Sequence, residues 1–468
     1  MFDAKSFIMA GEKIFIYQPD GEPMTYGEAS SRIDDIVDSL SDCDGRLCLF
    51  FFQNDVGSVL TYIALMRAGC IPVPLPPDLS QAAVSNYSKA YGCELIAGNE
   101  QTMLDFPGQV RCQIGSVTIK AQDCLETSVP LSKNCALLLA TSGSTGDMKA
   151  IRVSHLNINE VSSSIVEYLG LSSKDVLATS LPLYYSYGLS VLHAAIYCHA
   201  ALSVGQFSLL DKKYWKQLAV DKVTVLSAVP SMLNNLSKLG FDQLVPTTLR
   251  VLTVAGGRLS NLRTEEYLDL SLRLGFSFFS MYGATEASPR MSYVPPEKAR
   301  QKLGSAGIPI PGGSFSIDPR GIDEDGEIVY RGLNVALGYA TERSDLDKDD
   351  EFRGCLHTGD LGYLDQDGFL YVTGRIKRIS KQQGVRLNLD HLETILSEHS
   401  IEGMVIEMDE QLTVVIVEGD VGAVKEALGS CVSRAVKFRV MKIKNFPTNA
   451  NGKRDYKALT ETLKERIA

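Results

Sequence analysis

The chemistry that the sequence offers most directly is phosphate binding, in a loop that follows a short apolar segment. Residues 137–140 are apolar, and the next residues are rich in hydroxyls and glycine before Lys149 adds a positive charge. Glycines let backbone N–H groups approach a ligand, and hydroxyls with a lysine suit phosphate oxygens. The stretch predicts a polyphosphate cradle or, alternatively, a flexible turn after a buried strand; it lacks the Gly-Lys-Ser/Thr of a Walker loop. The cradle residues are Thr141, Ser142, Gly143, Ser144, Thr145, Gly146 and Lys149.

Two more strand-like segments, residues 249–254 and 276–281, end in glycine turns that carry polar side chains. Open α/β sheets bind ligands at such strand ends. In the second turn Tyr282 can stack on a base, Thr285 can donate to a phosphate and Glu286 can hold Mg²⁺. The turn residues are Ala255, Gly256 and Gly257, then Tyr282, Gly283, Ala284, Thr285 and Glu286.

A cluster of tyrosines follows another strand-like segment, residues 176–182. Tyrosine rings are amphipathic, so the cluster predicts either the wall of a substrate pocket or ordinary core packing. The residues are Tyr184, Tyr185, Tyr187 and the adjacent Gly188.

The elements that position these residues alternate between strand and helix. Residues 47–52 form a continuous apolar run that predicts a buried strand, and residues 56–68 predict a helix that ends at Gly69. Residues 71–77 contain prolines and therefore predict an extended edge segment or a connector. Beyond residue 300, short strands with glycine turns predict a small antiparallel or barrel-like subdomain. The C-terminal residues carry their own helix and strand patterns.

Bulk composition describes a soluble globular protein of more than one domain. The chain has 468 residues, 45% hydrophobic residues and a formal net charge of −10, which argues against nucleic acid or an anionic membrane as the main partner. The ten cysteines contain no Cys-x-x-Cys pair and fit a reducing cytoplasm. Residues 1–13 do not resemble a signal peptide, and no apolar run approaches the length of a membrane helix.

In their order, these motifs resemble the adenylate-forming superfamily, which includes acyl-CoA synthetases, nonribosomal-peptide adenylation domains and beetle luciferases. The resemblance implies an α/β fold with a large N-terminal domain, built from layered sheets and a small barrel-like subdomain, and a smaller, mobile α+β domain. The corresponding ranges are 1–375 and 376–468. The matching motifs are residues 24–28, 67–75, 141–149, 282–286, 327–339, 358–360, 374–375 and 451–453.

The resemblance also implies roles for single residues. Ser142–Thr145 and Lys149 would hold the pyrophosphate portion of ATP, Tyr282 would stack on adenine, and Glu286 would bind Mg²⁺. Thr285 would contact phosphate, Asp360 and Arg375 would bond the ribose hydroxyls, and Lys453 would bridge the substrate carboxylate and the α-phosphate. Lys377 would be the hinge, and Lys381 and Gly384 would face the site in the thioester step. The acid pocket would comprise Tyr184, Tyr185, Tyr187, Gly188, Ala255, Gly256 and Ala284.

The implied reaction is the ATP-dependent activation of a small carboxylic acid, followed by transfer to coenzyme A. Transfer to a holo carrier protein and non-catalytic nucleotide binding remain alternatives. Two departures from the family pattern matter. Pro-Lys-Gly is replaced by Met148-Lys149-Ala150, and the tyrosine segment lacks the aspartate that pairs with an α-ammonium group. The second departure disfavours an ordinary α-amino acid, because a buried ammonium group without a partner is costly.

Overall fold

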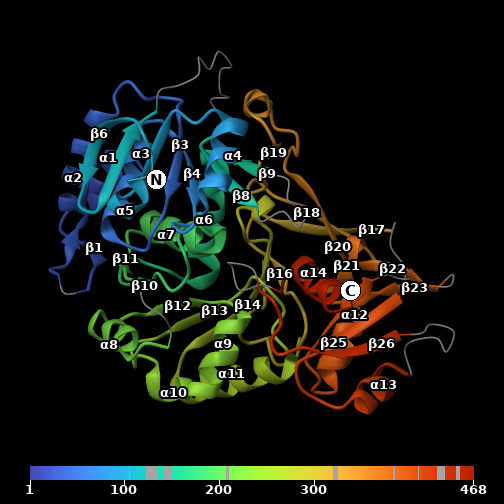
Figure 1. The fold of residues 1–468 in the computed structure, drawn as a ribbon. Coiled ribbons are helices and arrows are strands. Elements are labelled where there is room, and N and C mark those ends of the chain that lie inside the picture. Colours follow the sequence, from blue (N-terminus) through green and yellow to red (C-terminus); the bar gives the residue numbers. More distant parts are fainter. Residues whose placement is uncertain are drawn as a thin grey trace.

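The computed structural model describes residues 1–19, 21–104, 106–122, 134–141, 149–206, 210–319, 325–382, 385–408, 411–429, 438–448 and 454–467. Two large sheets dominate the N-terminal part of the chain (Figure 1). The nine-stranded sheet has the order β16-β15-β14-β13-β12-β10-β11-β1-β2, and the five-stranded sheet has the order β4-β3-β5-β7-β6. The run from β1 through β14 is parallel, and the ends of the sheet are antiparallel.

The strands of the nine-stranded sheet are β1 (Ile14–Tyr17), β2 (Met24–Thr25), β10 (Val176–Ala178), β11 (Ala201–Ser203), β12 (Val225–Ala228), β13 (Val251–Val254), β14 (Ser277–Tyr282), β15 (Ser292–Tyr293) and β16 (Ile308–Pro309). Those of the five-stranded sheet are β3 (Leu47–Phe51), β4 (Ile71–Leu75), β5 (Leu95–Asn99), β6 (Gln109–Ile114) and β7 (Val117–Ala121).

Two smaller antiparallel sheets connect the large ones to the rest of the chain. One has the order β19-β9-β8, with β8 (Leu137–Thr141), β9 (Lys149–Val153) and β19 (Gly338–Ala340). The other has the order β17-β18-β20-β21, with β17 (Ser314–Asp318), β18 (Gly326–Arg331), β20 (Cys355–Leu364) and β21 (Leu370–Arg375). The antiparallel subdomain predicted beyond residue 300 is therefore present.

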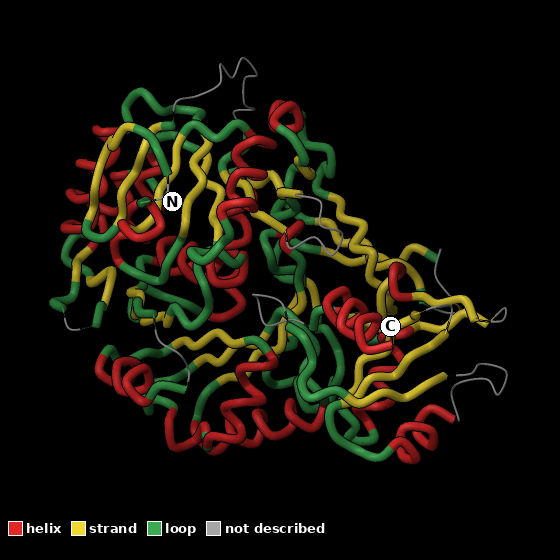
Figure 2. Tube along the Cα trace, in the orientation of Figure 1, coloured by secondary structure: helices red, strands yellow, loops and turns green. Residues whose placement is uncertain are grey.

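Helices lie along the faces of the large sheets, in red in Figure 2. They are α1 (Ala4–Ala10), α2 (Tyr26–Ser39), α3 (Val56–Arg67), α4 (Gln81–Tyr91), α5 (Glu100–Met103), α6 (His155–Leu169), α7 (Ser186–Cys198), α8 (Lys212–Val220), α9 (Pro230–Leu239), α10 (Phe241–Leu244) and α11 (Asn261–Leu274). Short 3₁₀ turns are η1 (Thr285–Ala287), η2 (Arg343–Asp347) and η3 (Ile376–Arg378).

Local sequence explains several of these elements directly. All five residues of β3 are buried, as its continuous apolar run predicts. The Asp55 carboxylate caps α3 by accepting from the Ser58 N–H, and Gly69, just beyond the helix, has a φ of +74°. Pro72 and Pro74 lack backbone donors, and β4 accordingly lies at the edge of its sheet, next to β3.

The buried side chains form separate cores that follow these layers. The largest core joins Phe50 of β3, helices α3, α6 and α7, and Phe279 of β14, so it fills the space between the two large sheets. The other face of the nine-stranded sheet packs on α8, α9 and α11. The other face of the five-stranded sheet packs on α4 and β8. The predicted α/β class with layered sheets is confirmed.

The C-terminal elements have cores of their own. Two clusters draw all their buried members from residues 387–463. The elements are β22 (Ile379–Gln382), β23 (Val385–Asn388), α12 (Leu389–Glu398), β24 (Gly403–Met408), β25 (Gln411–Ile416), α13 (Val421–Gly429), β26 (Phe438–Lys442) and α14 (Tyr456–Ile467). Separate cores support the predicted division into ranges 1–375 and 376–468, which stays a prediction. Within the described ranges, no helix is both long enough and apolar enough to cross a bilayer.

Candidate active site

Strand β14 ends at Tyr282, whose side chain reaches the antiparallel sheet that contains β20 and β21. The Tyr282 hydroxyl donates a 2.5 Å hydrogen bond to Asp360 Oδ2. Arg375 is the cross-strand partner of Asp360, and its Nε atom lies 3.2 Å from Asp360 Oδ1. Burial raises the pKa of Asp360, although Arg375 opposes that shift. The three residues predicted to hold adenosine therefore meet, and together they offer an acceptor and a donor to a diol.

A second cluster joins the end of the predicted phosphate loop to the turn after β14. Tyr339, in β19, donates a 2.9 Å hydrogen bond from its hydroxyl to Glu286 Oε1. The Nζ atom of Lys149 lies 3.2 Å from the centroid of the Tyr339 ring, because β19 pairs with β9, which begins at Lys149. Burial and the Glu286 carboxylate raise the pKa of the Tyr339 phenol. One tyrosine thus holds both the loop lysine and the predicted Mg²⁺ ligand.

The tyrosine-rich segment also lies against the turn after β14. The hydroxyl oxygens of Thr285 and Ser186 are 3.1 Å apart, and Ser186 is the first residue of α7. Tyr187 is buried, and its hydroxyl oxygen lies 2.8 Å from Thr253 Oγ1 on β13. Its ring centroid is 6.5 Å from that of Tyr185. Tyr187 is therefore part of the core, and it also lies beside the predicted acid pocket.

Two glycines of the predicted site have no room for a side chain. A Cβ atom on Gly283 would lie 1.7 Å from the Pro289 carbonyl oxygen, and one on Gly188 would lie 2.2 Å from the Pro182 carbonyl oxygen. By contrast, a Cβ atom on Gly257 would meet only the Pro230 ring, at 3.4 Å. The first two glycines let the turn after β14 and the start of α7 pack directly on neighbouring backbone.

The structure describes some of the other predicted site residues and not the rest. Tyr184, Tyr185 and Ala284 are half-buried and Ala255 is buried, while Gly256 has a φ of +86°. Lys377 lies in η3 and Lys381 in β22, both exposed. The remaining site residues lie outside the described part of the chain: Ser142, Gly143, Ser144, Thr145, Gly146, Gly384, Lys453 and the side chain of Thr141.

Three residues that contact the predicted site had no role predicted from the sequence. Tyr339 stood only at the end of a glycine-rich pattern, and Ser186 stood only within the tyrosine segment. The pairing of β19 with β9, which brings Tyr339 to Lys149, joins residues far apart in the chain and leaves no local signal. Arg290 belonged to no motif at all, although its side chain is buried and its guanidinium lies 4.0 Å from the Tyr187 ring centroid.

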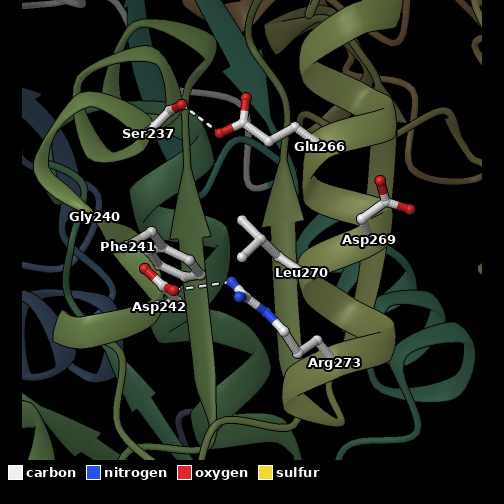
Figure 3. Close-up of a pocket in the computed structure, with 8 residues that line it drawn as sticks. All are labelled: Ser237, Gly240, Phe241, Asp242, Glu266, Asp269, Leu270 and Arg273. Carbon is white, nitrogen blue, oxygen red and sulfur yellow. Dashed lines mark hydrogen bonds and ion pairs between the residues drawn. The ribbon is translucent and has the colours of Figure 1, made fainter.

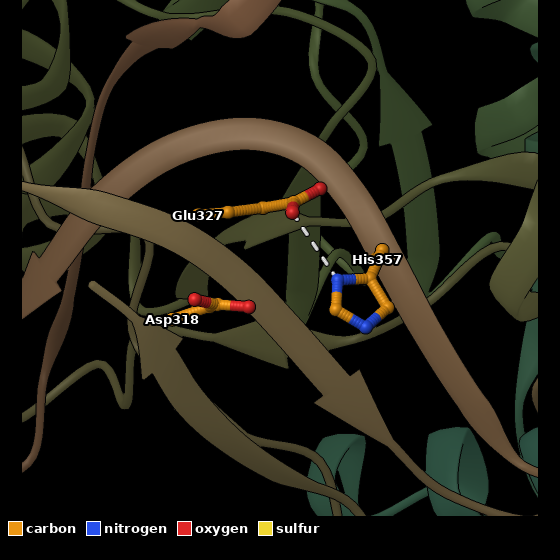
Figure 4. Close-up of side chains that lie close together, drawn as sticks. All are labelled: Asp318, Glu327 and His357. Carbon is orange, nitrogen blue, oxygen red and sulfur yellow. Dashed lines mark hydrogen bonds and ion pairs between the residues drawn. The ribbon is translucent and has the colours of Figure 1, made fainter. Parts of the chain in front are cut away.

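Glu327 contacts a bulged part of β20 just before Asp360, and Figure 4 shows its side chain beside those of Asp318 and His357. Its Oε1 atom accepts a 3.1 Å hydrogen bond from the Gly359 N–H, and its Oε2 atom lies 3.2 Å from His357 Nδ1. Asp318 is opposite Glu327 on the neighbouring strand β17, so the three side chains gather on one face of the sheet. Glu327 thus holds the bulge that β20 forms at residues 358–360.

The hollow drawn in Figure 3 lies between α9, α10 and α11, on the outer face of the nine-stranded sheet. Its two sides are joined by polar contacts, among them one from Ser237 to Glu266 and a 2.9 Å ion pair between Arg273 and Asp242. None of the predicted site residues lines it. The hollow is therefore separate from the clusters around Tyr282 and Glu286.

Comparisons with known proteins identify the family of the chain. Residues 8–340 match the AMP-binding enzyme family. The 2-succinylbenzoate–CoA ligase of Bacillus cereus strain AH820 is 30% identical over 95% of this chain and 94% of its own length. That of Geobacillus sp. strain WCH70 is 26% identical over 83% of this chain and 79% of its own.

Solved structures show the same fold. The O-succinylbenzoate coenzyme A synthetase MenE of Bacillus subtilis, in complex with AMP, has a TM-score of 0.78 and 23% identity, and covers 98% of this chain and 97% of its own. ATP-bound MatB from Rhodopseudomonas palustris has a TM-score of 0.78 and 20% identity over the full length of both chains. The chain therefore belongs to the AMP-binding enzyme family, the group of AMP-forming, adenylate-producing ligases.

Proposed function

We propose that this protein is an AMP-forming acid–CoA ligase whose active site lies where β14, β19 and β20 meet. The observation that carries the proposal is the cluster in which Tyr339 holds Lys149 and Glu286, next to Thr285. A cation, a carboxylate and a hydroxyl at the end of a parallel strand suit the phosphates of a nucleotide. The Tyr282, Asp360 and Arg375 contacts supply the neighbouring nucleoside site.

The reaction needs electrostatic stabilisation and orientation rather than a general base. A carboxylate oxygen attacks the α-phosphorus of ATP, an acyl–oxygen–phosphorus link forms, and the bond to pyrophosphate breaks. The acceptor thiol then loses its proton to solvent, the resulting thiolate attacks the acyl carbon, the carbon–sulfur bond forms, and the acyl carbon–oxygen bond to AMP breaks. Because a carboxylate is already ionised at neutral pH, cations that offset the repulsion between the reacting anions have the largest effect. Lys149 and Lys453 are the proposed cations.

The residues at Glu286 fit a magnesium ion. A carboxylate oxygen is a ligand that Mg²⁺ accepts, and Tyr339 bonds to Oε1 of Glu286, which orients the carboxylate. When bound, the ion would neutralise phosphate charge and polarise the phosphoryl oxygens. Glu286 would hold it, Thr285 would donate to phosphate, and Tyr339 would keep Glu286 in place.

The second half-reaction is proposed to use a rotation of residues 376–468 at Lys377. The separate cores of that part of the chain support its motion as one body. Lys453 would then serve acyl-adenylate formation, while Lys381 and Gly384 would face the site during thioester formation. A Lys377→Pro variant should retain pyrophosphate exchange and lose thioester formation. Equal loss of both steps would remove Lys377 from the hinge.

The acceptor is proposed to be coenzyme A. Relatives that cover almost the whole chain are named CoA ligases, which favours coenzyme A over a carrier protein. A cytoplasmic location is proposed as well, since ten scattered cysteines without a Cys-x-x-Cys pair suit a reducing compartment. The substrate is a small carboxylic acid, and the tyrosines at the start of α7 would form part of its pocket.

The test is acid-dependent exchange of radiolabelled pyrophosphate into ATP. A panel should include dicarboxylic, monocarboxylic, hydroxylated, aromatic and amino acids, and the productive acids should then be chased with coenzyme A or with holo carrier protein. We expect pyrophosphate exchange, followed by formation of a coenzyme A thioester with release of AMP. Thioester formed only on the carrier protein would replace the proposed acceptor. Nucleotide binding without exchange for any acid would favour the non-catalytic alternative.

A further inference from the structure

Arg290 is a cation enclosed in the protein interior. Its side chain emerges next to β15, and the residue is 3% exposed. One guanidinium nitrogen, Nη2, lies 3.1 Å from Ser190 Oγ on α7, and Nη1 lies 3.2 Å from the sulfur of Met281 on β14. The guanidinium also stacks on Tyr187, with Cζ 4.0 Å from the ring centroid.

These neighbours are poor partners for a full positive charge. None of the ion pairs among the described residues involves Arg290, and its buried Nε atom has no hydrogen-bond acceptor there. Met281 sulfur is a weak acceptor, yet the Tyr168 hydroxyl also donates to it, at 3.1 Å. Two strong donors therefore converge on one thioether. Because a buried charge without an anion is costly, this arrangement suits an anion brought by a ligand.

The position of Arg290 links it to the acid pocket. Its Cα atom would lie 3.1 Å from a Cβ atom placed on Gly283, so its backbone passes directly behind the turn after β14. Its side chain then extends to Tyr187 and Ser190 in α7, the helix that begins with the predicted pocket residues. Burial raises the pKa of the neighbouring Tyr185 phenol, and the Arg290 charge opposes that rise. The cation thus lies behind the wall of the pocket, while Lys149 lies at the phosphate side.

We propose that Arg290 binds a second carboxylate of the acid substrate, so that the enzyme activates dicarboxylic acids. One carboxylate would react at the nucleotide, and the other would accept from the Arg290 guanidinium, with Tyr168 as an additional donor. The proposal rests on the proposed ligase function and specifies its substrate class. The substrate named for the similar ligases, 2-succinylbenzoate, carries two carboxylates, which agrees with this chemistry.

The first test uses the unmodified enzyme and acids that differ by one carboxylate. Pyrophosphate exchange is compared for 2-succinylbenzoate and 4-oxo-4-phenylbutanoate, and for suberate and octanoate. At least one diacid should exceed its monoacid by about 30-fold or more in kcat/KM, the range expected when a buried charge gains its partner. Equal or better use of both monoacids would overturn the role of Arg290 but leave the ligase function intact. Exchange with no acid of the wider panel would overturn both.

The second test removes the charge without shortening the side chain much. Arg290→Met should reduce kcat/KM for the diacid by about 30-fold or more and leave the monoacid within about threefold, so the preference disappears. Arg290→Lys should retain part of it, because the charge remains and the planar fork is lost. Arg250→Met is the matched control, since Arg250 pairs with the buried Asp175 at 2.5 Å; it should weaken the fold without changing the ratio of the two acids.

Thermal unfolding separates this role from a structural one. Without acid, Arg290→Met should melt at or above the temperature of the unmodified protein, because a buried charge without an anion has been removed. Only the unmodified protein should gain stability from the diacid. A large fall in melting temperature for Arg290→Met, together with an unchanged acid preference, would show that the guanidinium serves the fold and would overturn the proposal.

Discussion

Replacing Tyr339 with phenylalanine tests how the two halves of the proposed site are connected. The substitution removes the hydroxyl that donates to Glu286 Oε1 at 2.9 Å. It keeps the ring that lies 3.2 Å from Lys149 Nζ and 5.2 Å from the Phe352 ring. The change therefore isolates one hydrogen bond to a charged group, worth about 1.5–3 kcal/mol.

If that hydrogen bond orients Glu286 for Mg²⁺, Tyr339→Phe should lower kcat/KM for Mg·ATP in pyrophosphate exchange by about 10- to 150-fold. Tyr339→Leu should raise the activation free energy of exchange by about 0.5–2 kcal/mol more, because the contact between the ring and the Lys149 ammonium is lost as well. Tyr371→Phe is the control, since Tyr371 stacks on Tyr363 away from the cluster; its kinetics should match those of the unmodified enzyme.

A double-mutant cycle with Glu286→Gln decides whether Tyr339 acts through Glu286. When Glu286 is already a neutral amide, removal of the Tyr339 hydroxyl should have a much smaller effect than in the unmodified enzyme. The coupling free energy should then approach the cost of the hydrogen bond. Full additivity of the two changes, or a Tyr339→Phe variant within twofold of the unmodified enzyme, would refute the reasoning.

Three further predictions concern glycine packing, acid stability and the lysine of the C-terminal part. Gly283→Ala should abolish measurable pyrophosphate exchange and lower the melting temperature, because its Cβ atom would overlap the Pro289 carbonyl. Gly257→Ala should keep an exchange rate within about threefold of the unmodified enzyme. Similar behaviour of the two variants would contradict the close approach of Gly283 to Pro289. Burial lowers the pKa of His193 from 6.5 to about 3, so the unfolded chain binds a proton that the folded one excludes. The free energy of unfolding in urea should therefore fall by about 1.4 kcal/mol per pH unit below about pH 6.5, and His193→Gln should flatten that slope; an unchanged slope would assign it to other groups. Lys453→Ala should reduce exchange by about 10²- to 10³-fold and retain ATP binding, and intact exchange would exclude the proposed role.

Local patterns predicted the elements whose burial follows from their own sequence. The apolar run of β3, the capped helix α3 and the proline-containing edge strand β4 all lie where the sequence placed them. The strand predicted over residues 176–182 was too long, because β10 ends at Ala178. Beyond that point the chain leaves the sheet, and Asn54 accepts the Leu183 N–H and donates to the carbonyls of Thr179 and Leu181. No local periodicity records those contacts.

The site was predictable where it consists of motifs and unpredictable where it depends on long-range packing. Tyr282 and Asp360 were identified separately by their motifs, but the hydrogen bond that joins them spans 78 residues. Arg290 had no motif, and its burial becomes visible only once α7 and β14 are packed together. The sequence therefore predicted the residue types that the proposed chemistry needs, whereas the buried cation beside α7 carried no local signal.

The pairing of Asp360 with Arg375 has a consequence for the fate of the reaction intermediate. Both residues precede Lys377, and they are held to each other across β20 and β21. If the chain turns at Lys377, Asp360 and Arg375, the proposed nucleoside-binding pair, would stay with the N-terminal part while residues 376–468 move. The mixed anhydride would then never need to be released and recaptured between half-reactions. The fraction of this intermediate lost to hydrolysis would then depend on how fast residues 376–468 rotate. At low thiol concentration, the yield of thioester would be set by that rotation rate rather than by the affinity for nucleotide.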